Sequence, residues 1–328
     1  MKTAKLKRLR LKLLIFLIVT SLLIINIGNT DATIEISKIQ NNQKDEIDAQ
    51  IISNSIPTIS GNDNTSYWAV IIVVGGGRGY RHHALWGIRT ANGLMNVLIN
   101  HGWQKNKIKC LIEKEAAKDA IFDTFQWLND SGEDEDDVIL FCFIGHGYNH
   151  TEDQPPLDEP DGKDDCYFPW DDKVNSWSWD TYILDDELET KFDTLKSKNI
   201  VAIFDTCLSG GWIDGTSDPC KSGRIILTSC AVDEASAPII ARMHWLFTHY
   251  LIQGLKGRAD KNNDKFVSAE EAFSYAKLPT IIRSTIFNLI VYLIEPVPLT
   301  QHPQLYDGWP TSDNNHQDLN IINLTKKK

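Results

Sequence analysis

The sequence predicts an α/β domain with a mostly parallel central sheet and helices on both faces. Strongly apolar, β-branched runs predict buried strands at 67–74, 107–112, 138–144, 201–204 and 224–229. Segments with helical apolar spacing alternate with them at 84–100, 116–128, 184–195 and 245–255. Strands and helices that alternate through short connections predict right-handed crossovers and a parallel sheet.

The first 30 residues form a segment that we expect to lie outside the folded domain. Six basic residues and no acidic one precede an apolar run from Leu13 to Ile27. This pattern is typical of a secretory signal peptide or of an N-terminal membrane anchor, and the sequence leaves both open. Either one predicts an exported protein that is extracellular or anchored on the outer face of the cell membrane.

Charge and length set the class of protein. Of the 33 basic residues six lie in the leader, so 27 remain against 44 acidic residues, a formal charge of −17. This excess disfavours a nucleic-acid partner, because phosphate binding needs basic surface. Residues 31–66 are polar and lack periodicity, which predicts a linker or pro-segment. We expect one domain over 67–310 and a polar C-terminal tail at 311–328.

Two predicted strands deliver reactive side chains to one edge of the sheet. The strand at 201–204 ends shortly before Cys207, and the strand at 138–144 ends shortly before His146. The carboxyl ends of parallel strands share an edge, where ligands bind. A nearby imidazole takes the proton of a thiol and makes it a strong nucleophile. Backbone amides beside Cys207 and at Gly147 would then bind the oxyanion of an acyl-transfer intermediate.

Short motifs around these residues resemble a known family. The segments FIGHG at 143–147 and DTCLSG at 205–210 resemble the His-Gly and Asp-x-Cys-x-Ser-Gly signatures of the caspase-like (clan CD) cysteine peptidases, which include caspases, metacaspases, legumains and gingipains. The segments YWAV at 67–70 and YRHHA at 80–84 are similar to the start of a legumain-type peptidase. The resemblance covers most of residues 67–277.

The resemblance implies a caspase-like three-layer α/β/α sandwich and endopeptidase activity on peptide or protein substrates. It implies catalysis by His146 and Cys207 through a thioester that water hydrolyses, with no cofactor required. A peptide amine that intercepts the thioester would make the protein a legumain-like transpeptidase. The competing hypothesis is a non-catalytic, calcium-stabilised extracellular binding module of the same fold.

The resemblance also implies a pocket for P1, the substrate residue before the cleaved bond. It places Arg81, His82, Asp205 and Ser229 in that pocket. An acid alone selects Arg or Lys, whereas an acid beside an arginine favours Asn, which both donates and accepts hydrogen bonds. Because Arg81 and His82 stand where legumain has them, we expect Asn at P1. Asp205 replaces the glutamate of legumain, which keeps Arg or Lys as the alternative.

A calcium-binding loop is a further hypothesis for residues 260–271. Oxygen ligands fall at positions 1, 3, 5, 7, 9 and 12 of an EF-hand pattern, namely Asp260, Asn262, Asp264, the carbonyl of Phe266, Ser268 and Glu271. Position 6 is Lys265 instead of glycine, which adds a repelling charge. The alternative is a solvated loop that caps the following helix.

An acidic insertion at 148–182 is too polar for a core element, and we expect it to form a lid beside His146. Its acidic cluster at 158–165 resembles the acidic loops of calcium-dependent metacaspases, but we interpret it as a solvated part of the lid. Cys166 and Cys220 lie in loop-like stretches and are candidates for a disulfide.

Overall fold

The computed structural model describes residues 65–75, 81–149, 152–155, 157, 159, 162–170, 181–213, 219–236, 238–239, 244–292, 300–310 and 318–326. The chain divides into two compact units, residues 1–62 with 290–296, and residues 63–289 with 297–328. Of the first unit only residues 290–292 are described, and the second unit is the α/β domain.

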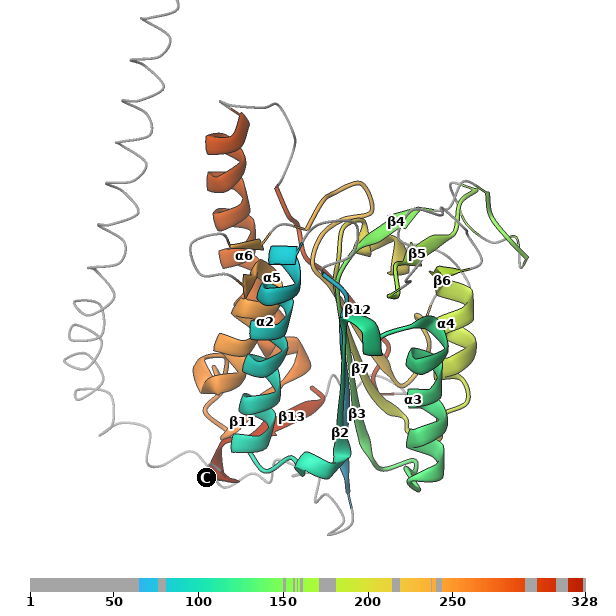
Figure 1. Cartoon of the computed structure of the whole chain (residues 1–328). Coiled ribbons are helices and arrows are strands. Elements are labelled where there is room, and N and C mark those ends of the chain that lie inside the picture. The colour runs from blue at the N-terminus through green and yellow to red at the C-terminus, as the bar shows by residue number, and fades with distance from the viewer. Residues whose placement is uncertain are drawn as a thin grey trace, which may run out of the picture. The chain divides into compact units, whose positions relative to one another are not determined.

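A mostly parallel sheet forms the centre of this domain (Figure 1). Its strands are β1 (Tyr67–Val73), β2 (Ile108–Ile112), β3 (Val138–Ile144), β7 (Asn199–Asp205), β8 (Arg224–Thr228) and β12 (Gln304–Asp307). They lie in the order β12-β8-β7-β3-β1-β2. The first five along the chain pair in parallel, and β12 pairs antiparallel with β8 at one edge. The predicted parallel sheet is therefore confirmed.

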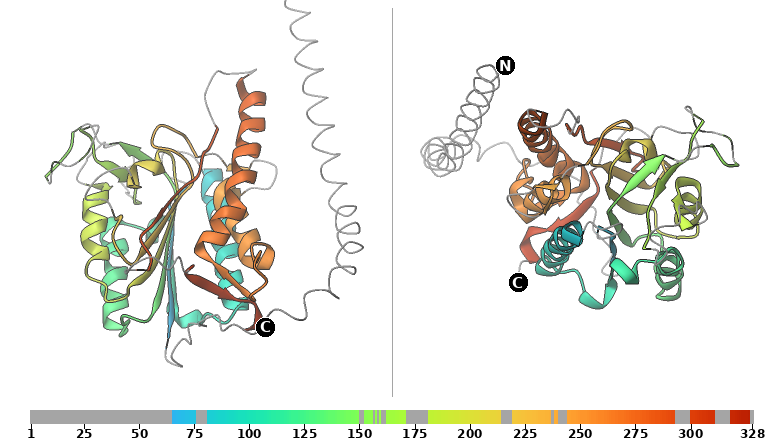
Figure 2. Two further views of the ribbon diagram at one scale, coloured as in Figure 1. Left: turned by 180° about the vertical axis from the view of Figure 1, so that it is seen from behind. Right: turned by 45° about the horizontal axis from the view of Figure 1, so that its top comes forward.

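Helices cover both faces of the sheet (Figures 1 and 2). One face carries α2 (Arg81–Asn100), α5 (Leu246–Gln253) and α6 (Ala269–Tyr292), and the other carries α3 (Lys118–Asp130) and α4 (Asp185–Phe192). The expected three-layer α/β/α sandwich is thus confirmed. Helix α2 ends where the sequence predicted, because Gly102 takes a left-handed φ of 98° and Trp103 N–H donates to the Leu98 carbonyl at 3.1 Å.

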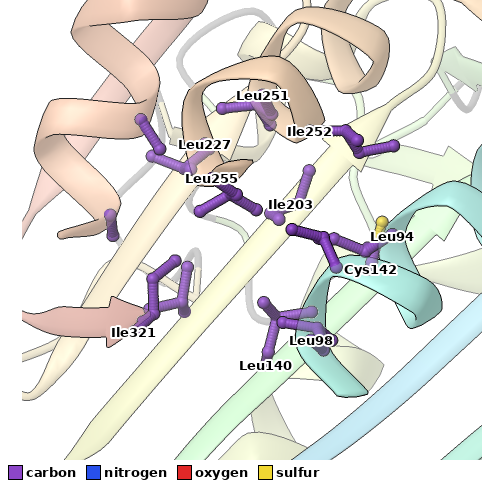
Figure 3. Close-up of a cluster of buried hydrophobic side chains, with 14 of the residues drawn as sticks. Leu94, Leu98, Leu140, Cys142, Ile203, Leu227, Leu251, Ile252, Leu255 and Ile321 are labelled. Carbon is purple, nitrogen blue, oxygen red and sulfur yellow. The ribbon is translucent and has the colours of Figure 1, made fainter. Parts of the chain in front are cut away.

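Alternate residues of each strand supply two separate cores, since successive side chains point to opposite faces. Leu140 and Cys142 of β3 join the core under α2 and α5, whereas Phe141 and Phe143 join the core under α3 and α4. All four are at most 1% exposed. Figure 3 shows the first core, in which side chains of α2, β3, β7 and α5 meet. The strands are apolar without interruption because both of their faces are covered.

The C-terminal segment departs from the expected polar tail. Strand β13 (Asn320–Asn323) pairs antiparallel with β11 (Phe266–Ser268). Ile321 and Ile322 are 2% and 1% exposed and belong to the core under α2 and α5. The prediction of a tail is therefore wrong for residues 318–326, because the polar average of the segment hides a short apolar strand.

A small antiparallel sheet joins the acidic insertion to the residues on either side of it. Its strands are β4 (Gly147–Asn149), β5 (Asp165–Tyr167) and β6 (Ile183–Leu184), in the order β4-β5-β6. Cys166 and Tyr167 are at most 1% exposed. The expectation that the insertion holds no core element is wrong at β5, because Tyr167 packs against Phe143 and Phe204 of the central sheet.

Two short strands, β9 (Pro238–Ile239) and β10 (His244–Trp245), pair with each other ahead of α5. Within the described ranges, no helix combines the length and the apolar character needed to cross a membrane. The predicted leader at 1–30 lies outside those ranges, as do most of the predicted linker at 31–66 and much of the 148–182 insertion.

Candidate active site

The two predicted reactive residues follow neighbouring strands of the sheet. Strands β3 and β7 pair in parallel register with Ile144 opposite Asp205. One step further, Gly145 N–H donates to the Asp205 carbonyl at 3.3 Å. His146 follows Ile144 by two positions, and Cys207 follows Asp205 by two positions. This register brings both residues to the same edge of the sheet.

Gly147 lies directly against the backbone of Cys207. A β-carbon at position 147 would lie 2.2 Å from the Cys207 carbonyl oxygen and 2.8 Å from Thr206 Oγ1. Any side chain would push these turns apart. A glycine here therefore allows the backbone after His146 to border the predicted nucleophile.

Aromatic residues and a backbone carbonyl surround the imidazole of His146. Its Nε2 lies 3.3 Å from the Gly75 carbonyl oxygen. Its ring centroid lies 5.8 Å from that of His83 on α2 and 6.4 Å from that of Trp245 on β10. Residues from three parts of the chain thus limit the positions that the imidazole can take.

Cys207 as a residue is partly exposed, and its Sγ lies 3.8 Å from the Ser236 carbonyl oxygen. Desolvation raises the pKa of the thiol, and the nearby charge of Asp205 raises it further. A thiol with a raised pKa keeps its proton at neutral pH, so it needs a base in order to react.

The turn after Cys207 is held in a strained conformation. Leu208 has a left-handed φ of 58°, which costs a non-glycine residue about 1–2 kcal/mol. Its N–H donates to the Glu234 carbonyl at 2.8 Å, which holds it there. A β-carbon on Gly210 would lie 2.5 Å from Val232 N, so the loop at 229–236 packs tightly on this turn.

Asp205, a predicted pocket residue, is fully buried at the end of β7. Its Oδ1 accepts a hydrogen bond from Ser236 Oγ at 2.7 Å, and its Oδ2 accepts from Thr248 N and Oγ1 at 2.9 and 2.8 Å. Burial raises the pKa of Asp205 because it disfavours the charged form, and these donors oppose the shift. Neutral hydrogen-bond donors therefore hold the carboxyl group of Asp205 in position.

The other predicted pocket residues are placed in part. Ser229 follows β8 and is buried, and its Oγ donates to the Thr206 carbonyl at 3.1 Å. Arg81 and His82 are the first two residues of α2, but their side chains lie outside the described part of the structure. The grouping of all four residues remains a prediction.

Sequence reasoning missed several residues that contact this region. Ser236 and Thr248 bind Asp205 from 31 and 43 positions away, and Gln301 binds Ser236 from 65 positions away. Glu234 supplies the carbonyl that holds Leu208. No motif marks these four residues, because their roles depend on contacts between distant parts of the chain.

The 260–271 loop has the backbone shape of an EF-hand in two respects. Asn263 and Lys265, at positions 4 and 6, take left-handed φ values of 61° and 73°. Asp264 N–H donates to Asn262 Oδ1 at 3.0 Å, and Phe266 N–H donates to Asp264 Oδ1 at 2.7 Å. These contacts hold the side chains of Asn262 and Asp264 against the backbone of the loop.

The remaining ligands lie at both ends of the loop. Ser268 N–H donates to Glu271 Oε2 at 3.3 Å, and Lys261 N–H donates to Glu271 Oε1 at 3.4 Å. Within the described residues, the buried Oδ1 of Asp260 has no hydrogen-bond partner. A buried acceptor without a donor suits a cation, so the residues present fit Ca²⁺.

A second group of acids combines two residues of the insertion with the first residue of α4. Among the described residues, ligand atoms of Glu159, Asp165 and Asp185 lie within 4.8 Å of one another. Asp164 and Asp165 are 0% and 3% exposed. The interpretation of this cluster as solvated is therefore wrong for these two residues, because β5 carries them into the protein. A β-carbon on Gly211 would lie 1.9 Å from Asp165 Oδ2, so this acid touches the turn after Cys207.

None of the six cysteines forms a disulfide. Cys166 Sγ lies 3.0 Å from the Tyr148 carbonyl oxygen, and Cys220 Sγ lies 3.7 Å from the Trp212 carbonyl oxygen. The proposed Cys166–Cys220 disulfide is therefore absent. Sequence spacing suggested a loop location for Cys166, but it lies in the middle of β5.

Residues 89–216 match the family model of the metacaspase, peptidase C14 domain. A search of curated proteins found no match. A caspase-1 from Spodoptera frugiperda is 11% identical, with a TM-score of 0.50 over 77% of this chain and 91% of that chain. A protein from Geobacter sulfurreducens is 14% identical, with a TM-score of 0.49 over 77% of this chain and 99% of that chain.

The family match contains both His146 and Cys207, and the likeness to the insect caspase concerns the fold. The family match supports cysteine peptidase activity in general. The chain resembles the caspase-like cysteine peptidases both in its fold and, over residues 89–216, in its sequence.

Proposed function

We propose that the protein is a cysteine endopeptidase in which His146 and Cys207 form the catalytic pair. The observation that carries this proposal is the parallel register of β3 and β7, which brings the residues after both strands to one edge. The partial exposure of both residues supports it, since a peptide must reach them.

In this mechanism His146 removes the proton of the Cys207 thiol, whose raised pKa otherwise keeps it protonated. The thiolate attacks the carbonyl carbon of the peptide. Backbone amides beside Cys207 and at Gly147 stabilise the oxyanion that forms. His146 then protonates the leaving amine, and water hydrolyses the thioester. A peptide amine in place of water would give the transpeptidase reaction.

The P1 preference is the finer part of the proposal. Arg81 next to Asp205 would favour Asn, which can accept from one and donate to the other. Ser236, Thr248 and Ser229, which are all neutral, hydrogen-bond to Asp205. An Asp205 without a cationic partner would instead select a basic P1 residue, which is the alternative. The pocket residues proposed here are Arg81, His82, Asp205 and Ser229.

The test is a library of peptides that differ only at P1, assayed with the wild type and with Cys207→Ala and His146→Ala. We expect cleavage after Asn, with loss of activity in both variants. Cleavage after Arg or Lys would select the alternative pocket. If no peptide is cleaved in a thiol-dependent way, with or without Ca²⁺ and after limited proteolysis, the peptidase proposal fails and the binding-module hypothesis gains.

We also propose that the 260–271 loop binds Ca²⁺ through Asp260, Asn262, Asp264, the Phe266 carbonyl, Ser268 and Glu271. The left-handed conformation at Lys265, where EF-hands have glycine, and the unpaired Asp260 Oδ1 support this. The ion would hold the start of the loop at Asp260 against β11 and the first turn of α6, because its ligands come from all three.

Thermal unfolding with Ca²⁺ and with a chelator tests the calcium site. We expect Ca²⁺ to raise the melting temperature, Glu271→Gln to abolish the effect, and Lys265→Gly to strengthen it. Lys265→Gly removes about 1–2 kcal/mol of left-handed strain and one repelling charge. The matched control is Asp185→Asn. If the rise in melting temperature survives Glu271→Gln and disappears in Asp185→Asn, the ion binds at the cluster of Glu159, Asp165 and Asp185 instead.

Export is proposed from residues 1–30. Fractionation of cells that express the full chain tests it, with a variant in which the apolar run is interrupted by charges. Cleaved protein in the medium would indicate a signal peptide, and full-length protein in the membrane fraction would indicate an anchor. Full-length wild type in the soluble cell fraction would contradict both.

A further inference from the structure

Gln301 is a fully buried amide behind the turn that carries Cys207. Its backbone N–H donates to Ser284 Oγ at 2.9 Å, which fixes it to α6. Its Nε2 lies 3.3 Å from the Ser229 carbonyl oxygen and 3.1 Å from Ser236 Oγ. Since a carbonyl oxygen only accepts hydrogen bonds, the amide group that faces Ser229 must be the NH₂.

The amide of Gln301 fixes the direction of a neighbouring hydroxyl. One N–H group of the amide donates to Ser236 Oγ. The hydroxyl proton of Ser236 is therefore available for another acceptor. That acceptor is Asp205 Oδ1, at 2.7 Å. The three residues form a directed chain of hydrogen bonds that ends on the carboxyl group two positions before Cys207.

The two partners of this amide are the ends of one loop, residues 229–236, which packs on the Cys207 turn. Within the loop, the Glu234 carbonyl accepts the N–H of Leu208 at 2.8 Å and maintains its left-handed conformation. The Ser236 carbonyl oxygen lies 3.8 Å from Cys207 Sγ. An amide that joins both ends of the loop therefore controls the surroundings of the thiol.

We propose that Gln301 is a positioning residue of the peptidase. Its side-chain amide holds the 229–236 loop closed and directs the Ser236 hydroxyl to Asp205, and it thereby sets both the reactivity of Cys207 and the choice of P1 residue. This inference rests on the function proposed above, and it adds a residue outside the motifs that suggested that function.

Two substitutions of similar shape test the donor role. Gln301→Met removes both donors, and Gln301→Glu replaces them with acceptors while the new carboxyl group is ionised. We expect kcat/KM to fall by about tenfold or more at neutral pH in both variants, as for a lost buried hydrogen bond. When pH is lowered, the introduced carboxyl group gains one O–H donor. The loss of kcat/KM in Gln301→Glu relative to the wild type should therefore become smaller. The loss of kcat/KM in Gln301→Met relative to the wild type should stay the same at every pH.

Other titratable groups near the amide are Asp205, Cys207, Cys230, Glu234 and His302. These groups are present in both variants. The pH profile of Gln301→Met therefore shows their effect without the introduced carboxyl group. Gln104→Glu, on the exposed surface, is the matched control and should behave as the wild type. Ser236→Ala should reproduce the loss of Gln301→Met, and the double variant should lose no more than either single one.

Alkylation of Cys207 by iodoacetamide gives a readout that needs no substrate. We expect its rate to differ from that of the wild type in both Gln301 variants, and the P1 profile to broaden. If the wild type cleaves no peptide while the alkylation rates differ, the proposed function fails and the positioning role stands. If the variants lose only thermal stability, with kcat/KM per folded molecule and alkylation unchanged, the inference is overturned.

Discussion

The thiol of Cys207 lies in surroundings that favour its protonated form. Because desolvation raises its pKa, the fraction of thiolate at a given pH is smaller than for a free cysteine, which titrates near pH 8.5. We expect the alkylation rate of Cys207 in the free protein to keep rising with pH beyond that point. Mass spectrometry of the Cys207 peptide measures the rate. A plateau already present at acidic pH would instead reveal a preformed thiolate–imidazolium pair.

Gly147 admits no side chain, since a β-carbon would meet the Cys207 carbonyl at 2.2 Å. We expect Gly147→Ala to lower kcat by about a hundredfold or more, because it shifts one proposed oxyanion donor. The control is Gly93→Ala on α2, where the nearest atom is a flexible Ile252 methyl at 3.3 Å. There we expect unchanged activity and a gain of up to about 1 kcal/mol in stability. Equal kinetics in the two variants would contradict the role of Gly147.

At the scale of single residues, the sequence predicts the functional residues that lie within recognisable motifs. It does not predict residues that reach the site from distant parts of the chain. His146, Gly147 and Cys207 follow recognisable strand ends, so their common edge could be predicted. Ser236 and Gln301 follow no pattern. Their positions depend on which distant segment covers the Cys207 turn, and apolar periodicity carries no information about that.

Helix α4 is joined to β8 through its last turn. Asp193 Oδ2 accepts from Lys221 Nζ at 2.7 Å, and Asp193 Oδ1 pairs with the buried Arg224 guanidinium. Burial alone would raise the pKa of Asp193, but the hydrogen bonds from these two cations outweigh it and lower the pKa. A carboxyl group whose pKa is lowered by folding stabilises the fold above its ordinary pKa and loses that contribution as pH falls through the lowered value.

We therefore expect Asp193→Asn to be less stable than the wild type at neutral pH, by about 1 kcal/mol for a partly exposed pair. The difference should vanish in strong acid. Chemical denaturation at a series of pH values measures it. Asp123→Asn, on the exposed side of α3, serves as a control with no such trend. A difference that is independent of pH would show that the charge of Asp193 is not what matters.

At the scale of elements, long apolar strands and periodic helices were predictable because burial on both faces leaves a continuous signal. The short strands were not. β5 has three residues between polar segments, and β13 has four, so neither offers enough positions for a period of two to be seen. Both are held by partners far along the chain, which the sequence alone cannot specify.

For the domain as a whole, β13 is an integral part of the core. Ile321 is 2% exposed and lies in the same core as Leu140, Ile203 and Leu255 (Figure 3). We expect Ile321→Ala to lower the free energy of unfolding by about 2–4 kcal/mol, as for other buried isoleucines. The control Lys326→Ala, at an exposed position, should change it by less than about 0.5 kcal/mol. Equal stabilities would mean that β13 is dispensable.

The aromatic stack between the insertion and the turn after Cys207 has an optical consequence. Tyr167 of β5 and Trp212, five residues after Cys207, lie with ring centroids 3.8 Å apart and an interplanar angle of 3°. Two chromophores so close and so fixed contribute to near-ultraviolet circular dichroism, whereas separated rings lose that signal. The protein thus contains its own spectroscopic reporter, and Tyr167→Leu would identify its bands. With it, movement of the insertion on substrate or Ca²⁺ addition can be followed in solution without an attached label.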